Sequence, residues 1–239
     1  MSVMVIVHGA WHDGSLFEPT AKPLRANGHD VHLPTLAGNN PGDDKQVGLT
    51  EAIDSLCAYI DDNELTDFVL VGHSYGGMVI TGTADRLGDR IQRLVYWNAF
   101  VPNDGESLND MVPPHYVAMF DSLTADDGSV ALPFEIWREA FINDAPLELA
   151  ESAYAQLNPH PLKTFSEPIS LTRNPSDFDT PKSYINCMED TAMPHSLPWH
   201  PRLSEKLGLF RLVQIPGSHE LCFSSPERLA AAIETAARP

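Results

Sequence analysis

Short apolar runs rich in β-branched residues recur along the chain, and turn residues bound each of them. Residues 3–7 read VMVIV and residues 68–72 read FVLVG. Apolar residues at every position, rather than at alternate ones, are typical of strands that are covered on both faces, as in a parallel sheet. Further strands are predicted at 30–35, 91–97, 182–188 and 210–215.

Helical patterns separate these strands. They are predicted at 15–28, 50–60, 75–87, 201–207 and 225–237. Strict alternation of strand and helix indicates a parallel sheet with right-handed crossover connections. Hydrophobic residues make up 43% of the chain, which is enough to fill the core of one α/β domain.

The alternation stops between residues 103 and 180. Prolines and Asp-rich turns there separate helical patterns near 134–142 and 146–157. We therefore predict an α/β fold with a mostly parallel sheet flanked by helices and an inserted, largely helical cap. Residues 1–102 and 181–239 are expected to form the core, and residues 103–180 the cap.

The chain is strongly acidic, with 33 Asp and Glu residues against 15 Lys and Arg residues and a formal net charge of −18. Such a field repels phosphate backbones and anionic lipid, so nucleic acid and membrane surfaces are not expected as partners. No apolar run approaches the length needed to cross a bilayer. The expected partner is a small-molecule substrate, and a homodimer is compatible with these features.

Three cysteines stand far apart without a CxxC pair, which argues against a disulfide framework and against a structural zinc site. The N-terminal residues MSVMVIV enter a strand directly and lack the pattern of a secretory signal. We therefore expect a cytoplasmic protein.

The segment FVLVGHSYGGMVITG places Ser74 between the strand at 68–72 and the helix at 75–87. A GxSxG turn in this context is typical of a nucleophile elbow, where the hydroxyl projects from a strained turn and the flanking glycines leave room for the neighbouring strand and helix. The helix N-terminus also favours negative charge near the hydroxyl. Ser74 is therefore the predicted nucleophile.

A serine nucleophile needs a base, and the base needs an acid that orients it. His219, in PGSHE, follows the strand at 210–215 and is the predicted base among ten histidines. Asp190 follows the strand at 182–188 and is the predicted acid, with Glu189 and Asp104 as alternatives. The chain order Ser74, Asp190, His219 is the order expected for this sheet topology.

The loop HGAWHDG after the first strand is predicted to supply one oxyanion-hole amide from Ala10, and Tyr75 the second. His8 and His12 lie four residues apart in this loop, but HGAWH lacks the glutamate of a HExxH site and no third ligand is evident. No metal site is predicted.

Aromatic residues of the predicted cap and core are expected to line an apolar substrate pocket. The residues predicted to line it are Trp11, His12, Trp97, Phe120, Phe134 and Trp137, joined by Phe141, Tyr154 and Phe165.

The segments HGAWHDG, GHSYGG, CMEDTAMP and IPGSHE resemble the compact branch of the α/β-hydrolase superfamily that includes plant methylesterases, hydroxynitrile lyases and small bacterial esterases. The resemblance covers essentially the whole chain. It implies a cap over the active site, catalytic positions at Ser74, Asp190 and His219, and oxyanion-hole positions at Ala10 and Tyr75.

The chain departs from this branch at several positions. In the hydroxynitrile lyases a threonine follows the first-loop histidine and a lysine follows the catalytic histidine, whereas this chain has Gly9 and Glu220. Because a carboxylate would repel the departing cyanide, the resemblance favours an esterase. The segment YWNAFVP also differs at Trp97 and Asn98 from the Leu-Asp pair of bacterial members.

These features predict a serine hydrolase that cleaves a small uncharged carboxylic ester through a Ser-His-Asp triad and an acyl-enzyme, without a cofactor. The alternatives are hydrolysis of an amide, carbamate or lactone and lyase action of the hydroxynitrile-lyase kind on the same site. A ligand receptor that retains the triad is a further alternative.

Overall fold

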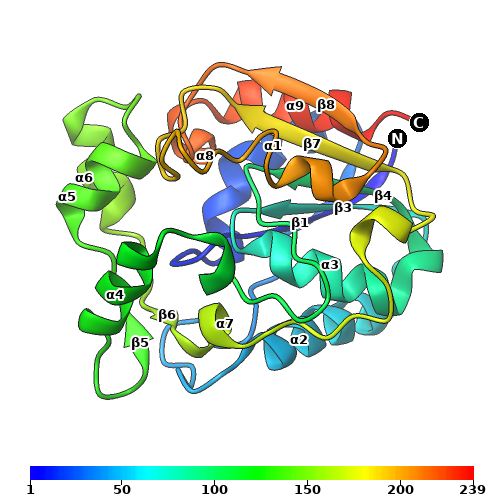
Figure 1. The fold of residues 1–239 in the computed structure, drawn as a ribbon. Helices are drawn as coiled ribbons and strands as arrows, with labels where there is room; N and C mark the ends of the chain where they lie inside the picture. Colours follow the sequence, from blue (N-terminus) through cyan, green and yellow to red (C-terminus); the bar gives the residue numbers. More distant parts are fainter.

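The computed structural model describes residues 1–239, and its centre is a sheet of six strands in the order β2-β1-β3-β4-β7-β8 (Figure 1). All neighbouring strands are parallel. The prediction of an α/β fold with a parallel sheet is therefore confirmed. The strands are β1 (Val3–Val7), β2 (Asp30–His32), β3 (Phe68–His73), β4 (Ile91–Trp97), β7 (Lys182–Cys187) and β8 (Arg211–Ile215).

Helices cover both faces of the sheet (Figure 1). Val69 and Val71 pack in one apolar cluster with residues of α1 and α9, whereas Leu70 packs in a second cluster with residues of α2 and α3. This is the two-sided burial that fully apolar strands predict, because successive side chains of a strand point to opposite faces. The helices are α1 (Glu18–Ala26), α8 (Leu221–Ser224) and α9 (Pro226–Ala237) on one side, and α2 (Leu49–Asp62) and α3 (Gly76–Leu87) on the other.

Most predicted elements differ from the structure by a few residues at their ends, and three of the differences are instructive. The strand predicted at 30–35 ends at His32, two residues before Pro34, which has no N–H to continue the strand pairing. The helix predicted at 134–142 is α5 (Phe134–Ile136) followed by a π-helical turn at Trp137–Phe141. The helix predicted at 201–207 is a single 3₁₀ turn at Ser204–Leu207.

The segment predicted as a cap, residues 103–180, lies between β4 and β7 in the chain. Its helices α4, α5 and α6 gather beyond the carboxyl ends of the strands, whereas α7 returns to the side of α2 (Figure 1). There, the Glu167 carboxylate accepts hydrogen bonds from the amides of Leu49 and Thr50 at 3.0 and 3.2 Å. The elements of this segment, besides α5, are α4 (Pro114–Ser122), β5 (Ser129–Val130), α6 (Leu147–Tyr154), β6 (His160–Pro161) and α7 (Lys163–Ser166).

No helix of the structure combines the length and the apolar character that crossing a membrane requires.

Candidate active site

Ser74 lies in the turn between β3 and α3, with its backbone in the left-handed region at φ +52°. Its amide donates a hydrogen bond to the Trp97 carbonyl at 3.2 Å, which holds the turn against β4. A Cβ atom at Gly76 would lie 2.7 Å from the His8 carbonyl oxygen, so only glycine allows α3 to begin this close to β1. The elbow predicted from GHSYGG is therefore the turn that the chain forms.

Backbone strain is concentrated around this turn. Five non-glycine residues have positive φ, and three of them, Trp11, Ser74 and Asn98, follow the carboxyl ends of β1, β3 and β4. These three strands are neighbours in the sheet. A non-glycine residue in the left-handed region costs conformational free energy, and such residues cluster at functional sites. The backbone strain therefore indicates the active site at this edge of the sheet.

His219 and Asp190 meet at the same edge, after β8 and β7. Nδ1 of His219 donates a hydrogen bond to Oδ2 of Asp190 at 2.6 Å, and both side chains are buried. Burial disfavours the charged imidazole, but the Asp190 carboxylate outweighs this effect and the pKa of His219 is raised. The amide of Ala192 donates to the other oxygen of Asp190 at 2.8 Å, which fixes the carboxylate.

The alternative acids lie elsewhere. Asp104 is exposed and its carboxylate accepts a hydrogen bond from the Leu171 amide at 2.8 Å. Glu189 is exposed as well, one residue before Asp190. Neither carboxylate is hydrogen-bonded to His219, so the geometry singles out Asp190.

Asn98 is a site residue that the sequence did not reveal, because its side chain cannot ionise. Its Nδ2 donates a hydrogen bond to Oδ2 of Asp190, and its Oδ1 accepts one from the Cys187 amide at 2.6 Å. The amide group therefore holds the carboxylate that orients His219. The signal that could have found it is its place directly after β4, at the carboxyl edge of a central strand.

A narrow cavity opens beside Ser74, which is the only non-hydrophobic residue that lines it. Trp199 and Phe141, both on the wall, also flank the His219 ring, at 5.2 Å stacked and 5.4 Å edge-on. No hydrogen bond joins Ser74 to His219 in this structure; such contacts are often long before a substrate binds. The cavity wall is Ala10, Trp11, Ser74, Tyr75, Phe100, Leu108, Val112, Tyr116, Phe120, Phe141, Phe165, Ala192, Met193 and Trp199.

Of the residues predicted to line the pocket, Trp11, Phe120, Phe141 and Phe165 lie on the wall of this cavity. Trp199 was missed, because it lies in a loop without a regular pattern.

The other predicted pocket residues do not line the cavity, and their side chains make contacts elsewhere in the protein. Trp97 points to the face of the sheet that α1 and α9 cover, where its ring stacks on the His73 ring with 3.8 Å between the ring centroids. Trp137 is fully buried and donates a hydrogen bond from Nε1 to the Ala150 carbonyl at 3.3 Å. Phe134 packs on Tyr154 at 5.2 Å between ring centroids. The remaining member, His12, faces Glu220.

Ala10 and Tyr75 line the cavity together with Ser74, and their amides make no hydrogen bond within the protein. Two unpaired N–H groups beside a serine hydroxyl can stabilise an oxyanion that forms between them. The predicted pair of donors is thus unpaired, and its role as an oxyanion hole stays a prediction.

The histidines of the first loop do not form a metal pair. Nδ1 of His8 donates to the Gly9 carbonyl at 2.8 Å, and its Nε2 accepts from the Leu36 amide at 3.1 Å. Both ring nitrogens are therefore occupied in the neutral form, and burial lowers the pKa of His8 to about 4.

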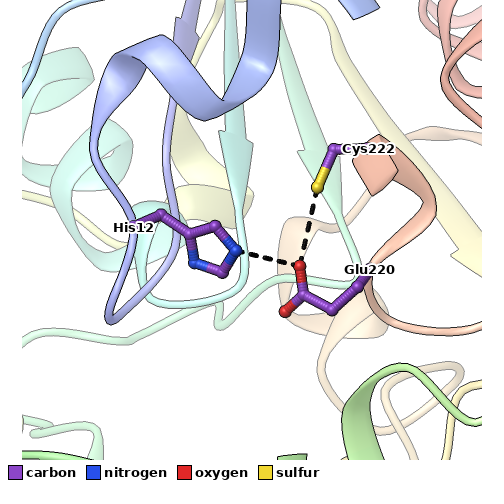
Figure 2. Close-up of side chains that lie close together, drawn as sticks. All are labelled: His12, Glu220 and Cys222. Atoms are coloured by element: carbon purple, nitrogen blue, oxygen red, sulfur yellow. Dashed lines mark hydrogen bonds and ion pairs between the residues drawn. The ribbon is translucent and has the colours of Figure 1, made fainter. Parts of the chain in front are cut away.

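His12 joins a buried cluster with Glu220 and Cys222 (Figure 2). Its Nε2 lies 3.0 Å from Oε2 of Glu220, and the Cys222 thiol donates to the same oxygen at 3.6 Å. Three donor atoms this close could hold a metal ion, but the charges of His12 and Glu220 complement each other without one. We assign the cluster as an ion pair supported by a thiol.

Several known proteins with related sequences are named as hydrolases or esterases. The sequence profile described as "Alpha/beta hydrolase family" matches residues 4–232. The carbendazim hydrolyzing esterase of a Nocardioides species is 33% identical over 240 residues, which cover 96% of this chain and 97% of that protein. A pyrethroid hydrolase of Sphingobium wenxiniae is 26% identical over 96% of this chain and 85% of its own length.

A solved structure of a Paenibacillus α/β-hydrolase aligns over 100% of both chains with a TM-score of 0.96 and 34% identity. That protein is described as extracellular and as sharing structural and functional homology with tobacco salicylic acid binding protein 2. An Arabidopsis methylesterase aligns over 99% of this chain and 98% of its own with a TM-score of 0.81, and its 22% identity supports the fold alone. The resemblance to plant methylesterases and small bacterial esterases is therefore confirmed, and the chain belongs to the alpha/beta hydrolase family.

Proposed function

We propose that the protein hydrolyses a small uncharged carboxylic ester through an acyl-enzyme on Ser74. The hydroxyl attacks the ester carbonyl while His219 takes its proton, and Asp190 holds the imidazole in the required tautomer. The Ala10 and Tyr75 amides stabilise the oxyanion, and His219 then protonates the leaving alcohol. Water releases the acid by the same route, so no cofactor takes part.

The main observation in support of this proposal is the environment of the Ser74 side chain. A strained serine is the only non-hydrophobic residue on an apolar cavity, and the rings that form the cavity wall also flank a histidine paired with a buried carboxylate. A structural turn serine needs neither the cavity nor the pair. The family supports the same reading, since the relatives are named as esterases and hydrolases.

The cavity favours an uncharged substrate, because no charged side chain lines it. A lyase of the hydroxynitrile kind would need a cation near the leaving cyanide, and the wall offers none. The Glu220 carboxylate, expected from the sequence to face the anion, points instead to His12. Amide, carbamate and lactone hydrolysis remain alternatives on the same machinery.

Labelling with a fluorophosphonate, followed by mapping of the modified peptide, tests the nucleophile directly. The adduct is expected on Ser74, and the Ser74→Ala variant should take up no label and lose turnover of p-nitrophenyl acetate. Full activity of Ser74→Ala would end the proposal. A thermal melt close to that of the unaltered protein serves as the control for folding.

A panel of p-nitrophenyl acetate, an aryl carbamate and mandelonitrile separates the alternatives by which compound turns over. A receptor would instead show very slow turnover and a large ligand-induced rise in melting temperature. The cytoplasmic location, the cap function of residues 103–180 and a homodimer stay predictions for this chain.

A further inference from the structure

His12 and Glu220 form an ion pair outside the wall of the cavity, and each side chain is 1% exposed (Figure 2). Nδ1 of His12 lies 2.6 Å from the Ala10 carbonyl oxygen, which can only accept, so Nδ1 carries a proton. Nε2 faces the carboxylate at 3.0 Å, although its N–H direction is not aligned for a hydrogen bond. Burial disfavours the charged imidazole, but the negative charge of Glu220 outweighs it, and the pKa of His12 is raised.

The pair joins two loops from opposite ends of the chain. His12 follows Ala10, the proposed oxyanion donor, by two residues, and Glu220 directly follows His219. No other hydrogen bond or ion pair connects residues 8–14 with residues 216–224. The ion pair is therefore the one direct polar contact between the loop of the oxyanion donor and the loop of the base.

The surroundings strengthen the interaction between the two charges. The rings of Phe17, Trp137 and Phe223 lie 5.9, 6.0 and 5.8 Å from the His12 ring and exclude water. The Cys222 thiol donates to the carboxylate, and burial raises its pKa, so it stays a donor. In such a site of low dielectric constant, charges a few ångströms apart act strongly on each other.

We propose that His12 and Glu220 are a positioning pair for the reaction. The ion pair holds the loop of Ala10 against the loop of His219, and the Glu220 carboxylate supports the imidazolium that forms when His219 takes the Ser74 proton. The inference rests on the proposed function.

Glu220 places an oxygen within 4.8 Å of a ring nitrogen of His219 and acts in the same direction as Asp190 on the pKa of His219. His73 stays neutral, since burial lowers its pKa well below the usual value. Other charges act less directly: Asp144 accepts from the Ser218 amide at 3.1 Å. The titratable groups that face His219 are thus Asp190, Glu220, His12 and His73, with Asp144 at the start of its loop.

The first test is the pH profile of kcat/KM for p-nitrophenyl acetate in Glu220→Gln. The rate falls at low pH as His219 becomes protonated, and Glu220 favours that protonated form. Removing its charge should therefore move the acid limb to lower pH and lower kcat about tenfold with little change in KM. If the acid limb of Glu220→Gln stays at its original pH, the inference is overturned. A purely structural role of Glu220 would lower the rate without shifting this limb.

The second test is a double-mutant cycle with His12→Gln. If the residues act as a pair, the double variant should lose much less kcat than the product of the two single losses. Losses that multiply would contradict the pairing. Where Glu220→Gln alone is too unstable to purify, the double variant should also move the acid limb to lower pH, because it lacks the Glu220 charge that raises the pKa of His219.

A matched control exists on the surface. His29 Nε2 lies 3.3 Å from Oε1 of Glu234, remote from the cavity, so Glu234→Gln should leave the pH profile and kcat unchanged. A limb shift in this control as large as that of Glu220→Gln would overturn the inference. Fluorophosphonate labelling of Glu220→Gln distinguishes a failure of this inference from a failure of the proposed function. If Ser74 is the nucleophile, it should still take up the label in this variant, whatever the pH profile shows.

Discussion

The carboxyl edge of the sheet and the wall of the cavity are built by different means. At the edge, Ser74, Asn98 and Asp190 are held by a strained backbone and by directed hydrogen bonds from neighbouring strands. The wall consists of apolar side chains such as Phe120 and Trp199, which pack without directional contacts. We therefore expect the edge to determine the chemistry and the wall to determine which substrate reaches it.

Asp190→Asn, at the edge, is expected to lower kcat more than any change in the cavity wall. An amide at this position would no longer select the Nδ1–H tautomer of His219, and kcat is expected to fall by about 10⁴-fold, as in other serine triads. The measurement is steady-state hydrolysis of p-nitrophenyl acetate. Asp104→Asn is the control and should keep full activity. A comparable loss in that control would move the acid to residue 104.

Asn98→Ala tests whether the hydrogen bonds at the edge matter for the reaction. It removes one donor to the buried Asp190 carboxylate, and a hydrogen bond to a charged group is worth enough to lower kcat about 10- to 100-fold. KM should change little, because Asn98 does not line the cavity. The matched control is Asn27→Ala, which removes an amide donor to Glu234 at 2.7 Å on the surface and should have no effect on kcat. Equal losses in the two variants would contradict a specific role for Asn98.

Phe120→Ala is expected to have the smallest effect on the chemistry and the clearest effect on selectivity. Phe120 lines both the cavity at Ser74 and a second cavity of about 270 Å³, so its removal should connect the two. We expect kcat for p-nitrophenyl acetate to change less than about tenfold, whereas kcat/KM for a bulkier aryl ester rises relative to it. The truncation of a buried Phe should cost about 3 kcal/mol of stability, visible in a chemical denaturation curve.

Phe134→Ala is the control for that variant. Phe134 packs on Tyr154 and lines neither cavity, so the ratio of the two esters should stay as it was. If Phe134→Ala changes the ratio as much as Phe120→Ala, the wall does not determine selectivity in the way that the cavity geometry suggests.

The sequence by itself determined the sheet and the turn at Ser74. Apolar runs with β-branched residues mark strands, and glycines at the elbow mark a close approach of backbones; both are local requirements of φ, ψ and burial. It also placed His219 and Asp190 after their strands, and parallel strands bring such positions to one edge. These features are readable because each depends on neighbours in the chain.

Only the tertiary structure decided which side chains meet there. Strand alternation puts Tyr96 and Trp97 on opposite faces, but the sequence does not say which face carries the cavity. The Asn98 amide on Asp190 and the ion pair of His12 with Glu220 join residues 92 and 208 positions apart. Contacts over such separations follow from packing of the whole domain, because no local pattern fixes the distance between two loops.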